Sequence, residues 1–507
     1  MGCDASSDDR IPLCTLCTRQ LRGPEESGNV EKPFNCALCF GVLDEKFADE
    51  VVAEVKKLYE SSGYDSKSFL LAINMPVTAI FRESLYELVN RDSSSNGTLS
   101  MVPFKLRIVN AYLERIRIAT GLSPSLNSDL ILTLTFMNDE FNKSDVDYLV
   151  KEFPGDFQIS RKRLRFANMD DTLLSMYTKV RIAGLIHKLN REYALIYKMA
   201  SPSTSCRYTI SFERSPLFIA GRYCKFSRNM SQSPWSASTD MKKIIGHSVS
   251  EKIGAPFVKE TGCDVARFIA SGREDIDVRM LGNGRPFVLE LINPKRIFSF
   301  QRHNLKTTLR RLEDSINKNL DVKVLSGLKQ ITSDQASLIK NGQDERRKLY
   351  TGYCCSTRKV DHLALEKLHH KAPIEVIQKT PVRVLKRRPL LERRRMIFSI
   401  AALKLDDYHF LIRMETQAGT YVKEFVHGDF GRTRPSLADL LGVECGEVDI
   451  LELDVEGVDM EWPPNGESRF LHCKRMTICC EDFKVNPWIE MLGGFIALLF
   501  NSSSKAE

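Results

Sequence analysis

The sequence predicts a soluble α/β protein of two or three domains. Segments with apolar residues at helical spacing are interspersed with segments that alternate like strands, which predicts mixed α and β structure. The 507 residues are too many for one hydrophobic core. Hydrophobic residues make up 43% and charged residues 27%, which is the balance of a globular protein.

Charge and cysteine content restrict the partners and the compartment. The net charge of +8 is modest but unevenly placed, and local basic clusters favour a polyanionic partner. The fourteen cysteines show no disulfide framework, because their most regular grouping has metal spacing and the others are scattered. We therefore expect a reducing intracellular location, in the nucleus, the cytoplasm or both.

No membrane association is expected. There is no secretory signal near the start, and the longest apolar tract, Gly493–Phe500, is too short to span a bilayer. Gly2 and Cys3 fit the loose pattern for N-terminal acylation, which stays an alternative. Asp8 and Asp9 argue against it, since an acidic membrane surface would repel them.

Two cysteine pairs near the start predict a metal centre. Cys14 and Cys17 form one CxxC hook and Cys36 and Cys39 form a second, with eighteen residues between the two. Four thiolates complete a tetrahedral site and leave no position for substrate, so we expect a structural Zn²⁺. The alternative is four unligated, buried cysteines. The His-x-Glu and Pro-Cys-x-x-Cys elements of a catalytic zinc deaminase are missing.

The region that follows is expected to be a mixed α/β accessory region. Helical spacing predicts helices over Glu50–Ser61, Lys105–Ile118 and Val180–Lys198, while Asp129–Phe136 alternates like a strand. Ser93–Gly97 is typical of a loop. The outer faces of the second and third helices are expected to carry the basic residues Arg107, Arg115, Arg117, Lys188 and Arg191. These faces suit RNA binding or plain solvation equally.

A basic and aromatic segment follows two expected strands, Arg207–Phe212 and Leu217–Ala220. It spans Gly221–Trp235 and interleaves cations with an aromatic ring, a pattern that offers phosphate contacts and a stacking surface. The candidate RNA-binding residues are Arg222, Tyr223, Lys225 and Arg228. A connector between domains is the alternative.

Ser271–Phe287 gathers charge beside strand-like segments. Its first part contains Arg273, Glu274, Asp275 and Asp277 within five residues. A carboxylate beside guanidinium groups stays ionised at neutral pH, which suits a nucleophile or an electrostatic stabiliser. The alternative is a solvated loop with local ion pairs. The neighbouring pattern predicts strands over Ala266–Ala270, Val278–Leu281 and Phe287–Ile292, with a hairpin turn at Gly282–Gly284.

The densest basic run of the chain lies further on. Its members are Arg383, Lys386, Arg387, Arg388, Arg393, Arg394 and Arg395. Arginines on a strand-loop-strand element can bridge successive phosphates of a folded RNA. A nuclear-localisation signal is the competing interpretation. Apolar residues within the run anchor it in a domain, and this favours contact with RNA.

These motifs resemble blocks of the tRNA pseudouridine synthase ten family, in the same order along the chain. The Arg-Glu-Asp triplet at 273–275 is similar to the catalytic motif of that family. The other matching blocks are Gly221–Trp235, Glu345–Tyr353, Gln378–Arg388 and Gly419–Leu437. Matches of this length, in order, are highly specific.

The resemblance implies roles for individual residues. Asp275 is the expected catalytic aspartate. Tyr350, with Tyr353 as an alternative, is expected to stack the target uracil. Lys423 is expected to pair with Asp275 and keep it ionised. The expected RNA-binding residues in this domain are Arg273, Arg383, Lys386, Arg387 and Arg388.

The resemblance also implies the domain organisation. We expect a zinc-binding segment at residues 1–40, a THUMP-like RNA-binding accessory domain at 41–235 and a mixed-sheet pseudouridine synthase catalytic domain at 236–464. Residues 465–507 would form a tail of unknown role.

The implied activity is isomerisation of uridine to pseudouridine in the TΨC arm of tRNA, at position 55 and in some cases 54. This chemistry needs no organic cofactor. We expect a monomer that binds tRNA, with other structured RNAs as further candidates. A non-catalytic factor for RNA binding, folding or processing is the alternative. A THUMP-containing methyltransferase would need a third glycine after Gly282-Asn283-Gly284.

Overall fold

The chain folds into two compact units, Met1–Ser215 and Pro216–Glu507, in the computed structural model. The structure describes residues 13–22, 36–90, 102–158, 168–234, 247–341 and 346–464. Three features expected from the sequence lie outside these residues, namely the loop at Ser93–Gly97, the acylation pattern at Gly2 and Cys3, and the tail at 465–507.

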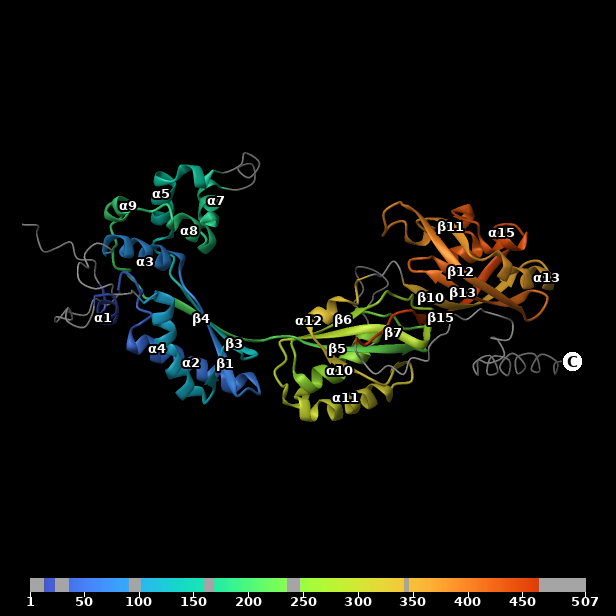
Figure 1. Ribbon diagram of the computed structural model, residues 1–507, viewed down its shortest axis with the longest axis horizontal. Helices are drawn as coiled ribbons and strands as arrows, with labels where there is room; N and C mark the ends of the chain where they lie inside the picture. Colours follow the sequence, from blue (N-terminus) through green and yellow to red (C-terminus); the bar gives the residue numbers. More distant parts are fainter. Residues whose placement is uncertain are drawn as a thin grey trace, which may run out of the picture. The chain divides into compact units, whose positions relative to one another are not determined.

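A mixed sheet forms the centre of the first unit, with strand order β2-β1-β3-β4 (Figure 1). β1 (Ser68–Asn74) runs parallel to β3 (Leu130–Met137), and β4 (Arg207–Arg214) pairs antiparallel with β3. Alternate residues of β3 are buried, from Leu130 to Phe136, so one face of the strand packs on the core. The strands expected here from the alternating pattern are confirmed.

Two of the expected helices are confirmed beside this sheet. α2 (Glu45–Ser62) begins at Asp44, whose carboxylate accepts hydrogen bonds from two backbone N–H groups of the first turn, and ends at Gly63 with a φ of 76°. α4 (Phe104–Thr120) packs against α2. Both helices bury an apolar face in the core of this unit.

The third expected helix is wrong, because two short helices replace it. α8 (Lys179–Ile186) and α9 (Arg191–Ile196) are separate elements. The Asn190 side chain accepts a hydrogen bond of 3.0 Å from the backbone N–H of Tyr193 and so begins a new helix within the expected one. The other described elements of this unit are α1 (Thr15–Arg22), α3 (Val77–Asn90), β2 (Ser123–Pro124), α5 (Asn142–Glu152), η2 (Pro154–Phe157) and α7 (Met169–Met176).

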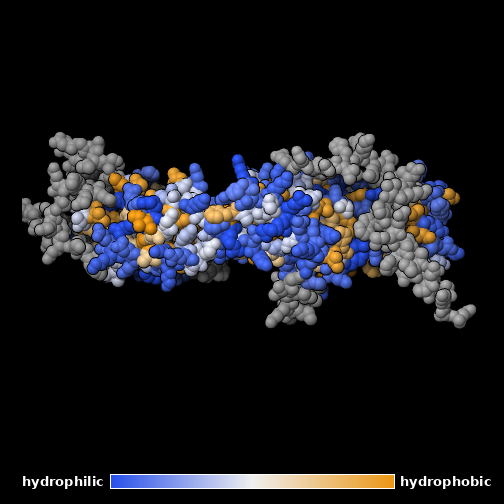
Figure 2. Space-filling view, turned by 90° about the horizontal axis from the view of Figure 1, so that it is seen from below, coloured by the Kyte–Doolittle hydropathy of each residue, from blue (hydrophilic) through white to orange (hydrophobic). Residues whose placement is uncertain are grey.

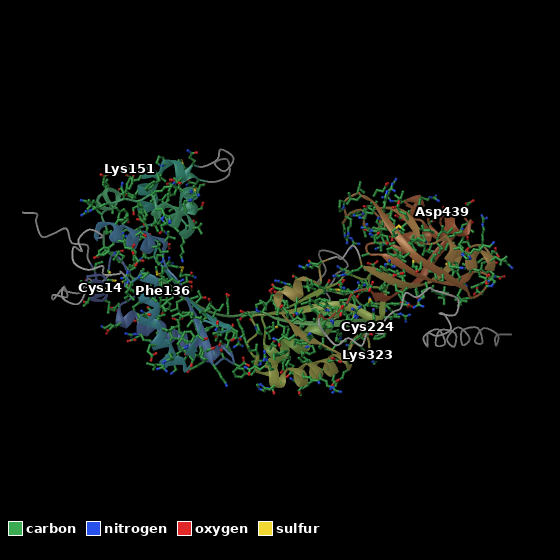
Figure 3. All side chains as sticks on the ribbon, viewed as in Figure 1. Cys14, Phe136, Lys151, Cys224, Lys323 and Asp439 are labelled. Atoms are coloured by element: carbon green, nitrogen blue, oxygen red, sulfur yellow. The ribbon has the colours of Figure 1, made fainter. Side chains whose placement is uncertain are left out.

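One large mixed sheet runs through the second unit. Its strand order is β14-β11-β12-β13-β10-β15-β7-β5-β8, with β6 paired to β7 and β9 to β5. β5 (Leu217–Lys225) is antiparallel to β7 (Arg279–Ile292) along most of its length. Pairing within this sheet assigns β5 to the second unit, so the boundary lies after Ser215 and not after residue 235 as expected. Cys224 of β5 lies opposite Lys323 of β8 (Figure 3).

The remaining elements of the second unit complete this sheet and cover it. α10 (Val249–Thr261) packs against β6, and α11 (Arg302–Asn317) packs against α10 and β8 (Figure 1). The other described strands are β6 (Val265–Ala270), β8 (Val322–Val324), β9 (Lys329–Ile331), β10 (Arg347–Ser356), β11 (Ile374–Lys379), β12 (Glu392–Lys404), β13 (His409–Gln417), β14 (Thr433–Arg434) and β15 (Val448–Val458). The other described helices are η3 (Phe298–Phe300), α12 (Ser333–Ser337), α13 (His362–Glu366), η4 (Lys367–Lys371), η5 (Val382–Val384), α14 (Val422–His427), η6 (Asp429–Gly431) and α15 (Leu437–Leu441).

The hairpin turn expected at Gly282–Gly284 is wrong, because these residues lie inside β7 as a bulge. Tyr223 of β5 pairs with Arg285, whereas Lys225, two residues on, pairs with Met280. A Cβ on Gly282 would lie 2.0 Å from the carbonyl oxygen of Glu456 in β15. The glycines therefore allow the backbone of β7 to pass closely against its neighbours.

The surface seen in Figure 2 is mostly hydrophilic, with hydrophobic side chains in separate patches. None of the helices within the described ranges has the length and apolar character needed to cross a membrane.

Candidate active site and metal centre

The charged loop between β6 and β7 presents Asp275 at the surface. The Asp275 side chain is 48% exposed, and its Oδ2 lies 3.1 Å from Nη1 of Arg383. The Nε of Arg383 donates to the buried carboxylate of Glu424 at 2.7 Å. Because the carboxylate of Glu424 orients the guanidinium, Arg383 offers Asp275 a positioned positive charge. Arg383 comes from the loop between β11 and β12.

The ion pair expected between Lys423 and Asp275 is not formed, since Nζ of Lys423 lies 2.5 Å from Oδ2 of Asp277. Partial burial acts to raise the pKa of Asp277, but the hydrogen bond and charge of Lys423 outweigh it and lower that pKa. The structure thus assigns each acid of the loop its own cation, Arg383 to Asp275 and Lys423 to Asp277.

Glu274, the third acid of the loop, is buried in a polar network. Its carboxylate accepts hydrogen bonds from Nε of Arg285 at 2.7 Å and from the Tyr223 hydroxyl at 2.8 Å. Arg285 also donates to the carbonyl of Ser271, and Gln232 donates to the carbonyl of Gly272. Burial and the charge of Glu274 raise the pKa of Tyr223, so its hydroxyl stays a donor. This network ties the loop to β5 and β7.

Lys225 holds the backbone of the same loop. Its ammonium group is buried and donates to the carbonyls of Met230 at 2.8 Å, Asp275 at 3.0 Å and Ile276 at 2.9 Å. Burial lowers the pKa of Lys225 to about 8, although the nearby carboxylates act in the other direction. The three donors of the ammonium match three carbonyls, and two of these belong to the loop.

The candidate RNA contacts of the Gly221–Trp235 segment are therefore corrected to structural roles. Arg222 is buried and donates to four backbone carbonyls, including those of Asn283 and Gly284 in the bulge. Arg228 pairs with Glu452 at 2.6 Å and Asp454 at 2.8 Å. Tyr223 and Lys225 are wholly buried. Arg222, Tyr223 and Lys225 bind the protein because β5 is flanked by β7 on one side and by β8 and β9 on the other. Arg228 follows β5 and is held by the two acids of β15.

Tyr350 lies on β10. It pairs with Val455 of β15, which in turn pairs with Met280 of β7. Paired residues share a face, so Tyr350 and Met280 flank Val455 on one side of the sheet. Tyr350 is half-buried against the core, and burial raises its pKa to about 12. The phenol is thus neutral, with an intact hydroxyl, at physiological pH.

The basic run forms the expected strand-loop-strand element from β11 and β12. Arg273 on the loop between β6 and β7 and Lys386, Arg387 and Arg388 between β11 and β12 are exposed. Arg394, in contrast, pairs with Glu375 across the strands at 2.8 Å. Arg273, Lys386, Arg387 and Arg388 thus face solvent, whereas Arg394 is paired with an acid of the neighbouring strand.

Two cations close to the charged loop, Arg285 and Lys348, were not predicted from the sequence. Arg285 and Lys348 lie within the blocks Ser271–Phe287 and Glu345–Tyr353, but nothing in either pattern predicts a role for these two residues. The Lys348 ammonium lies 3.1 Å from the position of a Cβ on Gly272. Burial, followed by the charge of Arg285, lowers its pKa to about 8. Only the pairing of β10, β15 and β7 brings these cations to the loop.

The four cysteines of the two hooks form a cluster that can hold a metal ion. Their sulfur atoms all lie within 4.8 Å of one another, and those of Cys14 and Cys39 are 3.7 Å apart. Bonds of about 2.3 Å to a tetrahedral Zn²⁺ place two sulfurs about 3.8 Å apart. The cluster packs in the core of the first unit with α2 and α4 (Figure 3 labels Cys14).

Arg107 supports this cluster from inside. It was expected on the outer face of its helix, but its side chain is buried. Nη1 donates to the sulfur of Cys17 at 3.2 Å, and Nη2 donates to the carboxylate of Glu83 at 2.9 Å. A guanidinium at this distance offsets part of the negative charge of a four-thiolate set.

Known proteins resemble this chain both in its second unit alone and over most of its length. A family model described as Pus10, C-terminal, matches residues 218–459, which lie in the second unit. The tRNA pseudouridine synthase Pus10 of Mus musculus is 32% identical over 452 residues, or 87% of this chain and 82% of that protein. Its counterpart from Homo sapiens is 31% identical over 438 residues, or 85% and 79%. The Pus10 of Methanocaldococcus jannaschii is 36% identical over 285 residues, or 52% and 58%.

These relatives are pseudouridine synthases, so the class of the protein is an isomerase. The chain belongs to the tRNA pseudouridine synthase Pus10 family. Among solved structures, a Cbf5-Nop10-Gar1 complex shows weaker likeness, with a TM-score of 0.24, 16% identity and coverage of 47% of this chain and 49% of that one.

Proposed function

We propose that this protein isomerises uridine to pseudouridine in the TΨC arm of tRNA, at position 55 and in some substrates 54, with Asp275 as the catalytic carboxylate. The observation that carries the proposal is the half-exposed carboxylate of Asp275, held by Arg383 on a loop whose other acids are paired elsewhere. The names of the relatives supply the tRNA substrate.

The proposed reaction is redox-neutral. The target uridine flips out of the RNA stack at a cost of a few kcal/mol. Asp275 assists cleavage of the bond between C1′ and N1, either by attack on C1′ or by deprotonating the ribose. The uracil turns, C5 bonds to C1′, the C5 proton is lost, and N1 gains a proton. Tyr350 stacks the uracil, and Arg273, Arg383, Lys386, Arg387 and Arg388 bind phosphates.

Mapping of pseudouridine in an unmodified tRNA transcript tests this proposal. After incubation with the protein, carbodiimide adducts read by primer extension are expected at position 55, with or without 54. A transcript with cytidine at 55 is the matched control and should lose that stop. Binding of the transcript without any modification would favour the alternative of a non-catalytic RNA-binding or RNA-processing factor.

The buried lysine predicts a specific pH dependence for this reaction. We expect activity to fall as the pH rises through about 8, because neutral Lys225 offers two donors to three carbonyls. Unfolding does not explain such a fall. The pKa in the folded protein lies below the usual 10.5, so the unfolded chain binds more protons between these values and the free energy of unfolding rises with pH.

Two variants test which lysine causes this fall in activity above about pH 8, the alkaline limb of the pH profile. Lys225→Met should show lower activity that no longer falls near pH 8. Lys348→Met, which removes the other ammonium with a pKa of about 8, should keep the limb. Rates of single-turnover pseudouridine formation between pH 6.5 and 9.5, a range set around that pKa, provide the measurement. A limb that disappears only in Lys348→Met would contradict the role of Lys225.

We further propose that the first unit is an accessory RNA-binding domain of the THUMP type, that its cysteine cluster holds a structural Zn²⁺, and that the protein acts as a monomer without an organic cofactor. The short separation of four sulfur atoms and their burial support zinc. Cys14, Cys17, Cys36 and Cys39 would hold the ion, which would cross-link α1 to the segment before α2.

Elemental analysis of protein purified without chelator should give one zinc per chain. Cys36→Ser should lose the zinc and lower the melting temperature, because metal binding contributes directly to folding free energy in such sites. Cys206→Ser, which changes a buried cysteine of the same core outside the cluster, is the control and should keep the metal. Wild-type protein that contains no zinc and has normal stability would contradict the proposal of a structural zinc site.

A further inference from the structure

Four successive residues after α14 adopt left-handed backbone conformations. The φ angles are 78° for Gly428, 46° for Asp429, 55° for Phe430 and 81° for Gly431. Residues other than glycine visit this region one at a time, because the Cβ then crowds the backbone. A run that includes an aspartate and a phenylalanine costs energy, and such strain persists only where the surroundings enforce it.

Buried contacts enforce this turn. The Asp429 side chain is buried, and its Oδ2 accepts a hydrogen bond of 3.2 Å from the backbone N–H of Val382. Arg383, the next residue, is the cation that contacts Asp275. A Cβ on Gly428 would lie 2.6 Å from the sulfur of Cys445, so the backbone is tightly packed there. The turn is thus held against the loop that contributes to the catalytic site.

The result of this arrangement is an aromatic ring in solvent. The Phe430 side chain is 90% exposed. Burial of the Phe430 ring contributes nothing to the stability of the fold, because the ring lies in solvent. The backbone that carries this ring is nevertheless held in a strained conformation. A single exposed apolar residue needs no explanation, but one at the apex of an enforced left-handed turn does.

Phe430 lies at the edge of a cavity of about 450 Å³ beside the catalytic loop. This volume falls within the roughly 300–1,000 Å³ of small-molecule sites. Asp277 and Lys423, the ion pair of the loop, form part of its wall, and β15 forms another part. The lining includes Asp277, Lys423, His427, Phe430, Leu451 and Glu452.

The chemistry of the lining fits a nucleobase better than a phosphate. Phe430 and the half-exposed Leu451 offer apolar surface for a flat ring. Nδ1 of His427 accepts a hydrogen bond of 3.0 Å from the backbone N–H of Asp429, which leaves the ring proton on Nε2 as a donor. The lining carries three carboxylates, those of Asp277, Asp449 and Glu452, against the one ammonium of Lys423, and this balance disfavours an anion. A carboxylate oxygen can accept a hydrogen bond from an exocyclic amino group.

We propose that this cavity binds an unstacked, amino-bearing nucleobase of the RNA substrate, distinct from the uracil that is isomerised, with its ring stacked on Phe430. The inference rests on the proposed function, because a substrate whose target base is flipped out near Asp275 has neighbouring bases close to the cavity. RNA recognised in its single-stranded parts is bound by such stacking on aromatic side chains.

Substitution of Phe430 tests this site without disturbing the fold. F430A should raise KM for an unmodified tRNA transcript about tenfold and leave kcat within about twofold, since stacking in both ground and transition states is lost. F430W should restore KM. The melting temperature should not change in either variant, because the ring makes no buried contact. Tyr408→Ala, which removes another exposed aromatic ring of the same unit outside the cavity, is the control.

The outcomes separate this inference from the proposed function. An unchanged KM in F430A would overturn the inference, and so would a loss of kcat alone or an equal rise of KM in Tyr408→Ala. If the wild-type protein makes no pseudouridine, the proposed function fails. In that case affinity for the same transcript decides the inference, with weaker binding by F430A expected and equal binding overturning it.

Discussion

Asp275→Asn is expected to lower the rate of pseudouridine formation by about 10⁴-fold or more, with RNA affinity nearly unchanged. Asparagine keeps the shape of the side chain and can accept from Arg383, but it lacks the carboxylate oxygen that attacks C1′ or deprotonates the ribose in the proposed reaction. The side chain is half-exposed and carries no core contact, so stability should be normal. Single-turnover assays at saturating protein, together with filter binding of the same transcript, separate the two effects.

A neighbouring acid is the matched control for this variant. Asp277 belongs to the same loop, is 63% exposed and forms an ion pair with Lys423. Asp277 also lines the proposed nucleobase cavity, but the single-turnover rate at saturating protein does not depend on binding strength. Because exposed ion pairs contribute little, Asp277→Asn should change that rate by only about two- to fivefold. Comparable rates for Asp275→Asn and wild-type protein would refute the catalytic assignment. A total loss of activity in Asp277→Asn alone would move that role to Asp277.

Arg285→Met should reduce the free energy of unfolding of the second unit by about 3–5 kcal/mol. The side chains of Arg285 and Glu274 are 1% and 0% exposed, and their closest atoms are 2.7 Å apart. Removing the guanidinium leaves a buried carboxylate without its cation and frees the carbonyl of Ser271. We expect the loop that carries Asp275 to become disordered, with loss of activity at temperatures where the rest of the unit is folded.

Hydrogen exchange in the full-length chain measures this effect locally, because unfolding of two units need not be a single transition. Peptides that cover Ser271–Val278 should exchange faster in Arg285→Met. Glu274→Leu combined with Arg285→Met should cost less than the single change, since no lone charge stays buried. Arg267→Met breaks an exposed pair with Glu290 on the adjacent strands and should have little effect. Normal protection in Arg285→Met would contradict the anchoring role of the network.

The sequence was informative wherever a local pattern has one physical solution. The spacing of Cys14, Cys17, Cys36 and Cys39 requires sulfur atoms that converge, and the four sulfurs do converge. Alternation in β3 and helical spacing in α2 and α4 reflect a single buried face, so these elements were predicted. The blocks around Asp275 and Tyr350 pointed to the enzyme class that the relatives share.

The tertiary structure alone decided which polar side chains face the protein and which face solvent. Arg222, Lys225 and Lys386 are alike in sequence terms, yet the first two bind backbone carbonyls inside the unit and the third is exposed. The choice depends on strands far apart in the chain, because burial of a cation is tolerated only where distant carbonyls or carboxylates converge on it.

The same reason explains the site itself. A glycine-rich segment typical of a turn became a bulge because β5 and β15 pass on either side of Gly282–Gly284. Arg383 rather than Lys423 meets Asp275 because the loop after β11 reaches the loop before β7. The sequence by itself determined the enzyme class and supplied the residues that we propose for the chemistry. Their partners were decided only by the long-range pairing of the sheet, which no local pattern encodes.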